Sequence, residues 1–371
     1  MMPTQHVLIA TGGTGGHVYP ALAVAEELQR RGIKVSWMGT RNGMESKIVP
    51  SKSIPLHYVS VTGLRGKGLI GWLQAPFKVT IAVYQALSIL IKQKPNVVLG
   101  MGGFVSGPGG IASWILRKPL VIHEQNTIAG MTNKMLSHFA THVVQAFPNT
   151  FKKNINAIHA GNPIRKDIEN MDSPKIRFNS RQNKEINVLV LGGSLGATAL
   201  NESLPKLFKN IGSTCPLNII HQSGTRNFDL TQSFYKKVPM KSEVIAYVDD
   251  MPKLYSWADI VICRSGALTV SELSVAGVGS ILIPYPYAVD DHQYFNARYL
   301  ADGDAAIVVR QSNLKSDDFK STLEKLLCNG RDRLLSMAEN ARGLAMQGAA
   351  TQVADLCCNL MLKPEQGISN G

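Results

Sequence analysis

The sequence predicts an α/β protein made of two domains, each with its own parallel sheet. With 371 residues the chain is too long for one compact core and long enough for two. Short apolar runs alternate with helical stretches, which is the pattern of parallel strands connected by crossover helices. The pattern also starts twice, because two apolar runs lead into glycine turns that lie 180 positions apart, at 12–16 and 192–196.

In the first half, apolar runs predict strands at residues 6–10, 34–38, 96–99, 120–122 and 142–145. Pro20 is expected to open a helix over 21–31, since proline suits the first helical turn, and Gly32 is expected to end it. A second helix is expected over 75–93.

The second half repeats this order, with strands expected at 187–191 and 259–263 and a helix at 200–210. The last stretch, 332–362, is also expected to be helical. Between the halves, residues 170–184 are polar, contain a proline and show no apolar period, so we interpret them as a linker.

Charge is distributed unevenly along the chain. Residues 1–166 hold 18 Lys and Arg against four acids, whereas the remaining residues hold 21 against 22. A basic half should attract an anionic partner, such as a membrane surface, a nucleic acid or a phosphorylated substrate. A generally basic protein is the alternative, which the neutral second half disfavours. No motif of interleaved aromatic and basic residues supports nucleic acid, so we expect no such partner.

The number of cysteines and the length of the longest apolar segment limit the class of protein further. The five cysteines form no CxxC pair and no metal-ligand spacing, and an odd count without a signal peptide favours reduced thiols in the cytosol. The longest apolar candidate, 79–91, is short and interrupted by polar residues, while a membrane span needs roughly 20 apolar residues.

Each glycine turn stands between a strand and a helix, where backbone N–H groups and the helix dipole favour an anion. We therefore predict that at least one turn binds phosphate, although a tight turn for packing alone is the alternative. Neither turn fits GxGxxG, and the second strand ends without an acid that could hold a ribose. A Walker A loop is also missing, so another nucleotide is expected.

Three further segments follow predicted strands. The run 100–110 has six glycines in eleven residues and predicts a deformable loop that a ligand can approach. His-Glu-Gln-Asn at 123–126 should lie at the carboxyl edge of the sheet, where doubly wound folds bind ligands. Residues 264–272 predict a small-residue turn and a helix start. There Glu272 could either accept bonds from a ribose diol or merely face the helix dipole.

In combination these motifs resemble the MurG family, the UDP-N-acetylglucosamine: N-acetylmuramyl-(pentapeptide) pyrophosphoryl-undecaprenol N-acetylglucosaminyltransferases. The similarity runs from Gly12 to about Arg342. It rests on the segments at 12–17, 100–110, 123–126, 161–165, 264–272 and 291–297.

The resemblance implies a GT-B fold, in which two Rossmann-like domains face each other across a cleft. Residues 1–165 would bind the acceptor and the membrane, residues 166–341 would bind the UDP-sugar, and a helix at about 342–362 would pack back on the first domain. The implied reaction is an inverting transfer of N-acetylglucosamine from UDP-N-acetylglucosamine to undecaprenyl-pyrophosphoryl-N-acetylmuramyl-pentapeptide (lipid I). It forms lipid II for peptidoglycan synthesis at the cytoplasmic face of the bacterial inner membrane.

The resemblance also implies donor-site residues from both domains. On the second domain, uridine, ribose and phosphate would be held by Ala267, Leu268, Thr269, Val270, Ser271 and Glu272, with Glu272 on the ribose. Val248 would lie against uracil, Ser194 near phosphate and Gln293 on the sugar hydroxyls. The first domain would contribute Thr14, Gly15, Gly16, Asn126 and Arg165.

Inversion by single displacement needs a base that takes the proton of the acceptor hydroxyl, and the candidates are His17 and Glu124. A free histidine titrates at about pH 6.5, close to working pH. His17 could equally be a donor that binds phosphate. No acidic metal cluster appears in the sequence, so no cofactor is required and a divalent metal stays an open question.

Two positions depart from the family pattern. Leu195 stands where the family commonly has Gln, so a polar contact near the donor is in doubt. Gly279 stands where the family usually has Pro, a backbone change expected to leave the chemistry untouched. The alternatives are a related transferase that glycosylates another lipid, such as diacylglycerol, and a non-catalytic nucleotide-sugar binder.

The stretch 62–78 mixes Leu, Ile, Trp and Phe residues with Arg65, Lys67 and Lys78. Apolar groups with Trp and flanking cations suit a bilayer interface, so we predict peripheral binding to an anionic membrane surface. The alternative is that these apolar residues pack into the first-domain core.

Overall fold

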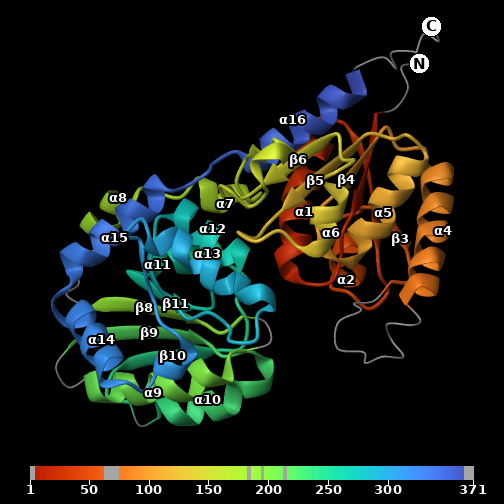
Figure 1. Cartoon of the computed structure of the whole chain (residues 1–371). Coiled ribbons are helices and arrows are strands. Elements are labelled where there is room, and N and C mark those ends of the chain that lie inside the picture. Colours follow the sequence, from red (N-terminus) through yellow and green to blue (C-terminus); the bar gives the residue numbers. More distant parts are fainter. Residues whose placement is uncertain are drawn as a thin grey trace, which may run out of the picture. The chain divides into compact units, whose positions relative to one another are not determined.

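The structure is a computed structural model that describes residues 5–61, 75–181, 185–193, 196–211, 215–236 and 238–362. The chain divides into two compact units. Unit 1 is formed by residues 1–165 and 348–371, and unit 2 by residues 166–347. Each unit is described by itself below (Figure 1).

Unit 1 is built on a seven-stranded parallel sheet with the order β3-β2-β1-β4-β5-β6-β7. Its elements are β1 (His6–Ala10), α1 (Gly15–Arg30), β2 (Lys34–Gly39), α2 (Glu45–Ser51), β3 (Leu56–Tyr58), α4 (Ala75–Gln93), β4 (Val97–Gly100), α5 (Gly103–Ile115), β5 (Leu120–Glu124), α6 (Met131–Leu136), β6 (His142–Gln145), β7 (Ile158–His159) and α16 (Ala349–Leu362).

The sheet of unit 1 is covered by helices on both faces, because alternate side chains of a strand point to opposite sides. Val7 and Ile9 of β1 pack with α1 and α16, while Leu8 and Ala10 pack with α4, α5 and α6. Helix α16 lies along α1, where Arg31 forms an ion pair with Asp355 at 2.6 Å. The C-terminal helix is thus part of the core of unit 1.

Unit 2 has a six-stranded parallel sheet with the order β10-β9-β8-β11-β12-β13. Its elements are α7 (Lys166–Glu169), α8 (Pro174–Asn179), β8 (Ile186–Leu191), α9 (Thr198–Ile211), β9 (Leu217–Gln222), α10 (Phe228–Tyr235), β10 (Lys241–Ile245), α11 (Met251–Trp257), β11 (Ile260–Cys263), α12 (Ala267–Ala276), β12 (Gly279–Leu282), α13 (His292–Ala301), β13 (Ala306–Val308), α14 (Asp317–Asn329) and α15 (Arg331–Gly343). One face of this sheet packs against α9, α14 and α15 through an apolar core.

These two sheets confirm the predicted α/β class and the prediction that each domain has a parallel sheet. Several boundaries differ from the sequence prediction. Helix α1 begins at Gly15 and not after Pro20, so the last two glycines of the turn belong to the first turn of the helix. The helical C-terminal stretch is divided into α15 and α16 by residues 344–348.

The predicted deformable loop over 100–110 is wrong, because most of it is helix α5. Glycines are placed there for close packing. A Cβ on Gly109 would come within 2.8 Å of the Ala10 side chain, and one on Gly110 within 2.7 Å of the Leu136 side chain. The helix can therefore approach the sheet and α6 more closely than a helix with larger side chains could.

The predicted linker over 170–184 is also partly wrong. It contains helix α8, which starts with Pro174 and is capped by the hydroxyl of Ser173. Arg177 and Phe178 of this helix are buried. A six-residue helix is too short to show an apolar period, which is why the sequence pattern missed it.

The expectation of reduced thiols is contradicted for one pair of cysteines. Cys215 and Cys328, 113 positions apart, form a disulfide in unit 2. Cys263, Cys357 and Cys358 are free. The pairing depends on the fold that brings the end of α9 near the end of α14, which residue spacing does not reveal.

Among the described helices, none combines the length and the apolar character that a membrane crossing requires. Within the same residues, no cluster of three or more His, Cys, Asp and Glu side chains is arranged to hold a metal ion.

Candidate active site

Both sheets reverse their strand order at one point, and ligands of open α/β sheets bind there, outside the carboxyl ends of the strands. In unit 1 this point lies between β1 and β4, which pair in parallel. In unit 2 it lies between β8 and β11. The predicted site residues of each unit follow strands at these edges.

At the edge of unit 1, a buried carboxylate holds the first glycine turn. Glu45 is fully buried, and its oxygens accept hydrogen bonds from the backbone N–H of Gly13 at 2.9 Å and of Thr40 at 2.8 Å. The hydroxyl of Thr40 donates a third bond at 2.8 Å. The Gly13 N–H is therefore already bonded to a carboxylate, so an incoming phosphate would have to compete with it.

The remaining predicted residues of this turn lie at the start of α1. Thr14 precedes the helix, with extended backbone, and Gly15 and Gly16 are its first two residues. Thr14 and Gly16 are exposed, while Gly15 is partly exposed. Helix N–H groups in the first turn have no partner within the helix, so they remain able to bind an anion.

His17, in the same first turn, is partly exposed. Its Nδ1 lies 3.0 Å from Oε1 of Gln125, which is buried with 1% exposure at the end of β5. Gln125 in turn contacts His123, because Gln125 Nε2 lies 3.2 Å from His123 Nδ1. Burial lowers the pKa of His123 to about 4, so this ring is neutral at physiological pH.

Glu124, the second predicted base, is 3% exposed and engaged within its own loop. Its oxygens accept bonds from the N–H of Asn126 at 3.0 Å, the N–H of Gly130 at 3.0 Å and the side-chain amide of Asn133 at 2.9 Å. These bonds engage both carboxylate oxygens within the loop itself. The geometry fits a residue that shapes the loop carrying Asn126.

Asn126 and Arg165 complete the predicted set of unit 1. The side-chain amide of Asn126 also contacts Glu124, at 3.2 Å. Arg165 is partly exposed and is the last residue of unit 1 before α7. Nearby, the Asn162 side chain donates to the Gln125 carbonyl at 3.1 Å, which ties the segment 161–165 to the end of β5.

At the edge of unit 2, β11 leads into α12, whose N-terminus is the predicted donor site. The helix begins at Ala267 after Gly266, and Leu268 and Thr269 are partly exposed. Val270 and Ser271 are buried. Ala267 is buried as well, so three predicted contact residues face away from solvent. The Val270 N–H already donates to the Gly266 carbonyl at 2.9 Å, so the N–H groups that precede it at the start of the helix are the candidate donors.

Glu272 lies one turn into α12 and is partly exposed. Its Oε2 accepts a hydrogen bond from the Tyr255 hydroxyl at 3.0 Å. Carboxylate oxygens are the acceptors that the two hydroxyls of a ribose diol would need. Tyr255 itself is fully buried, and its hydrogen bond holds the carboxylate of Glu272 in place.

The second glycine turn follows β8. The N–H of Gly193 donates to the neutral side-chain oxygen of Gln222 at 3.3 Å. The predicted phosphate contact Ser194 and the departure Leu195 lie outside the described residues.

Val248 and Gln293 also follow strands of this sheet at its carboxyl edge. Val248, after β10, is 9% exposed. Gln293 is at the start of α13, and its Oε1 accepts a bond from the backbone N–H of Tyr285 at 2.9 Å, which holds the segment after β12. Its side-chain NH2 is the end that a sugar hydroxyl could meet.

Sequence reasoning missed three residues of this architecture. Glu45 belongs to no sequence motif, and its role becomes visible only because the structure buries it beside the first glycine turn. Gln125 was present within the motif at 123–126 but received no role. Gly102 was included in a supposed loop, although it lies directly beside the His17 ring.

Known proteins match the chain along nearly its whole length. The Glycosyltransferase family 28 N-terminal domain matches residues 7–145, and the Glycosyltransferase family 28 C-terminal domain matches residues 187–355. The UDP-N-acetylglucosamine--N-acetylmuramyl-(pentapeptide) pyrophosphoryl-undecaprenol N-acetylglucosamine transferase of Nitrosococcus oceani is 45% identical over 95% of this chain and 97% of its own length. The enzyme of the same name from Methylococcus capsulatus is 47% identical over 95% of this chain and 98% of its own length.

The fold is similar to that of a solved structure as well. The crystal structure of Acinetobacter baumannii MurG matches with a TM-score of 0.84 and 40% sequence identity, covering 96% of this chain and 99% of that chain.

Proposed function

This chain belongs to the MurG family within glycosyltransferase family 28, and from that membership we infer its reaction. The protein transfers N-acetylglucosamine from UDP-N-acetylglucosamine to lipid I, which forms the β-1,4-linked disaccharide of lipid II and releases UDP. The observation that carries this conclusion is identity of 45–47% over 95% of the chain with transferases of this name. The GT-B fold, with a parallel sheet in each unit, agrees with it.

For the donor, we propose that unit 2 binds UDP-N-acetylglucosamine at the N-terminus of α12. The first N–H groups of this helix suit the diphosphate, and Glu272, held by Tyr255, suits the ribose. Gln293 and Val248 extend the proposed site toward the sugar and the uracil. The second glycine turn is the better phosphate candidate of the two, because Gln222 adds no negative charge there.

For the acceptor, the proposed site is a pocket of about 710 Å³ in unit 1. It is lined by Gly13 of the first glycine turn and by two cations, Arg41 and Lys78. Arg41 stacks on the ring of Tyr58 at 4.9 Å, which keeps its guanidinium in place. Two cations, with no acid among the described residues of the lining, suit a pyrophosphate.

For proton transfer, we propose His17 as the base that takes the proton of the attacking hydroxyl. Glu124 is occupied by the loop that it organises, whereas His17 is partly exposed and has one ring nitrogen outside its bond to Gln125. The base would act as the acceptor oxygen attacks the anomeric carbon and the bond to UDP breaks.

For the membrane, unit 1 offers an exposed apolar surface with cations. On α4, the side chains of Phe77, Tyr84 and Ile91 recur on one helical face and are 72%, 74% and 58% exposed. Helix α4 packs against α5, whose end exposes Trp114 at 61%. We propose that this surface binds the lipid bilayer peripherally, at the cytoplasmic face of the inner membrane.

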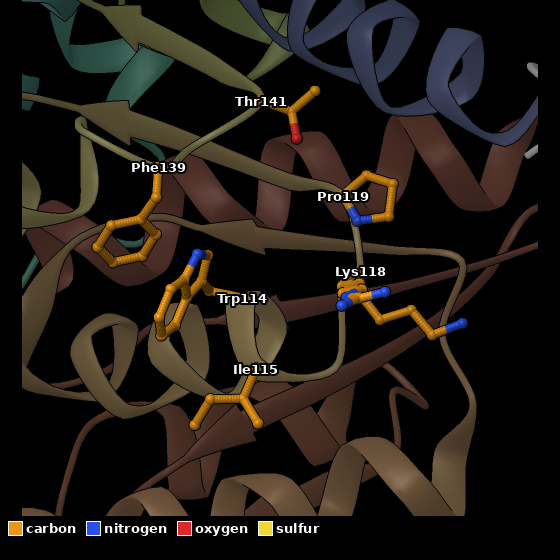
Figure 2. Close-up of a pocket in the computed structure, with 7 residues that line it drawn as sticks. Trp114, Ile115, Lys118, Pro119, Phe139 and Thr141 are labelled. Carbon is orange, nitrogen blue, oxygen red and sulfur yellow. The ribbon is translucent and has the colours of Figure 1, made fainter. Parts of the chain in front are cut away.

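Trp114 also lines a pocket of about 620 Å³ at the end of α5. Figure 2 shows the Trp114 and Phe139 rings beside one another, with centroids 5.9 Å apart, and the Lys118 amine extending away from them. Arg117 also lines the pocket. An exposed indole in a pocket that two cations also line suits the interface between lipid headgroups and acyl chains. Of the predicted membrane segment at 62–78, residues 62–74 lie outside the described residues.

The reaction is tested by measuring UDP release from UDP-N-acetylglucosamine with different acceptors. We expect release with lipid I and none with diacylglycerol or without acceptor. Release with diacylglycerol but not with lipid I would replace the proposed acceptor. Release that needs no acceptor would indicate hydrolysis in place of transfer.

A further inference from the structure

A chain of hydrogen bonds links His17 to the buried end of β5. Gln125 stands in its middle, with Oε1 at 3.0 Å from His17 Nδ1 and Nε2 at 3.0 Å from the Met101 carbonyl oxygen and 3.2 Å from His123 Nδ1. His123 is fully buried, and its Nε2 lies 2.9 Å from the carbonyl oxygen of Gly161. All polar atoms of the Gln125 side chain are thus engaged.

The direction of each bond follows from the two carbonyl groups, which can only accept. The carbonyl of Gly161 requires the proton of His123 on Nε2. Because the pKa of His123 is lowered to about 4 by burial, its ring carries a single proton and Nδ1 is an acceptor. The carbonyl of Met101 and His123 Nδ1 then each require one hydrogen of the Gln125 amide nitrogen.

This orientation leaves the Gln125 oxygen facing His17, so His17 Nδ1 must donate. We propose that Gln125 and His123 are positioning residues that fix the tautomer of His17, leaving the lone pair on Nε2 to accept the proton. The inference rests on the proposed role of His17 as the base. A flipped amide would place its oxygen against the Met101 carbonyl, where two acceptors would repel each other.

A glycine beside the bond gives independent support. Gly102 has φ of 78°, which favours glycine, and a Cβ there would lie 2.7 Å from His17 Nδ1 and 2.9 Å from Gln125 Oε1. Any larger residue would collide with the two atoms that form the bond. The backbone after β4 is therefore shaped to leave room for the contact between His17 and Gln125.

The fixed tautomer defines the proton path in the reaction. As the acceptor oxygen forms its bond to the anomeric carbon, His17 Nε2 takes the hydroxyl proton, and the electron pair of the breaking sugar–phosphate bond leaves with UDP. The Nδ1–H bond to Gln125 persists in the imidazolium that results. Gln125 is neutral, so it orients the ring without the added basicity that a carboxylate in its place would give. The other titratable groups on β5 are His123, which is neutral, and Glu124, whose oxygens are bonded to Asn126, Gly130 and Asn133.

The tautomer is measured directly by nitrogen-15 NMR of histidine-labelled full-length protein without substrate. We expect His17, assigned by comparison with His17→Ala, to carry its proton on Nδ1 at a pH where it is neutral. In Gln125→Leu we expect this preference to be lost. A wild-type His17 protonated on Nε2, or an unchanged tautomer in Gln125→Leu, would overturn the proposal.

Kinetics provide the second readout. Gln125→Leu should lower kcat at least tenfold while the KM for UDP-N-acetylglucosamine stays within about twofold. Gln125→Glu keeps the acceptor and adds a negative charge that favours the imidazolium, so the acid limb of kcat/KM should move about one pH unit higher. The control is Gln145→Glu on β6, where the side-chain oxygen accepts a bond from the Phe151 N–H at 3.2 Å.

An equal shift in Gln145→Glu, or none in Gln125→Glu, would contradict the positioning role. The proposed base role can fail separately. A fully active His17→Ala would remove it, even where NMR shows the expected tautomer.

Discussion

The carboxyl edges of the two sheets share a strand order and differ in their polar groups. The edge of unit 1 gathers buried, titratable side chains: Glu45 under the glycine turn, and His123 and Glu124 at the end of β5. The edge of unit 2 relies on backbone N–H groups at α12 and on one carboxylate, Glu272, fixed by Tyr255. We propose that one topology supports two tasks in this way, proton transfer by His17 in unit 1 and nucleotide binding in unit 2.

The two glycine turns show the same contrast. In the first, the N–H of Gly13 is bonded to the carboxylate of Glu45, whereas in the second the N–H of Gly193 is bonded to the neutral amide of Gln222. A glycine turn that looks like a phosphate site in sequence can therefore be partly filled by the protein's own anion. The difference arises from residues that lie far away in the sequence.

The largest effect is expected for the base in unit 1. His17→Ala should lower kcat by ~10²–10⁴, the usual contribution of one general base. Steady-state kinetics with both substrates saturating measure this effect. His138→Ala, which removes an exposed histidine of the same unit, is the matched control and should leave kcat unchanged. A loss below tenfold in His17→Ala would mean that another group or water takes the proton.

The next largest effect is expected on the stability of unit 2, at the buried side chain of Arg177. Arg177 is 5% exposed and donates to the carbonyl of Tyr255 in α11 and to the carbonyls of Ala276 and Gly277 at the C-terminal end of α12. Arg177→Met should leave these carbonyls without their donor and lower the free energy of unfolding by about 3 kcal/mol. Chemical denaturation measures the loss. Lys175→Met, at an exposed position of the same helix, should change the free energy of unfolding little. Equal losses of stability in the two variants would contradict the stabilising role of the Arg177 hydrogen bonds.

In unit 2, Glu272→Ala should raise the KM for UDP-N-acetylglucosamine tenfold or more. Loss of a polar contact to the ribose costs roughly 1–3 kcal/mol. Glu339→Ala removes an exposed carboxylate from α15 and is the control. A folded Glu272→Ala enzyme with an unchanged donor KM would refute the ribose contact.

A fall in pH should destabilise both units, because each contains a buried histidine that is neutral in the folded protein. Burial lowers the pKa of His123 to about 4 and of His221 to about 3. Between about pH 6.5 and these values the unfolded chain binds protons that the folded chain does not. The free energy of unfolding should therefore fall as the pH falls, by up to about 1.4 kcal/mol per pH unit and histidine.

Replacing His221 isolates the contribution of unit 2. In His221→Gln the fall in melting temperature from pH 6.5 to pH 4 should be smaller than in the wild type. His138→Gln, at an exposed position, should leave the slope as it was. An unchanged slope in His221→Gln would show that this histidine is not responsible for the acid sensitivity of unit 2.

The smallest effect concerns the surface of unit 1. Trp114→Ala and Phe77→Ala should each weaken sedimentation with anionic vesicles by severalfold, while Leu230→Ala, at a position 52% exposed in unit 2, should not. Salt should weaken wild-type binding without abolishing it, because salt screens the cations but not the apolar contacts. Equal losses in all three variants would argue against this surface as the membrane contact.

The sequence allowed the two sheets to be predicted because strand segments such as 7–10 and 120–122 are buried on both faces and therefore uniformly apolar. Helix α5 was missed because its glycines serve packing against Ala10 and Leu136, and glycine in sequence indicates a loop. The role of Gln125 was missed for a related reason. A glutamine has no preferred partner until the fold places Met101, His123 and His17 around it.

The donor affinities of His17→Ala and Glu272→Ala test most directly the proposal that unit 1 transfers the proton while unit 2 binds the nucleotide. Isothermal titration with UDP-N-acetylglucosamine should give His17→Ala a Kd within about twofold of the wild type. Glu272→Ala should bind at least tenfold more weakly, as loss of a polar contact worth roughly 1–3 kcal/mol implies. A His17→Ala protein that loses donor affinity as strongly as Glu272→Ala would contradict this division. It would instead make His17 a phosphate ligand.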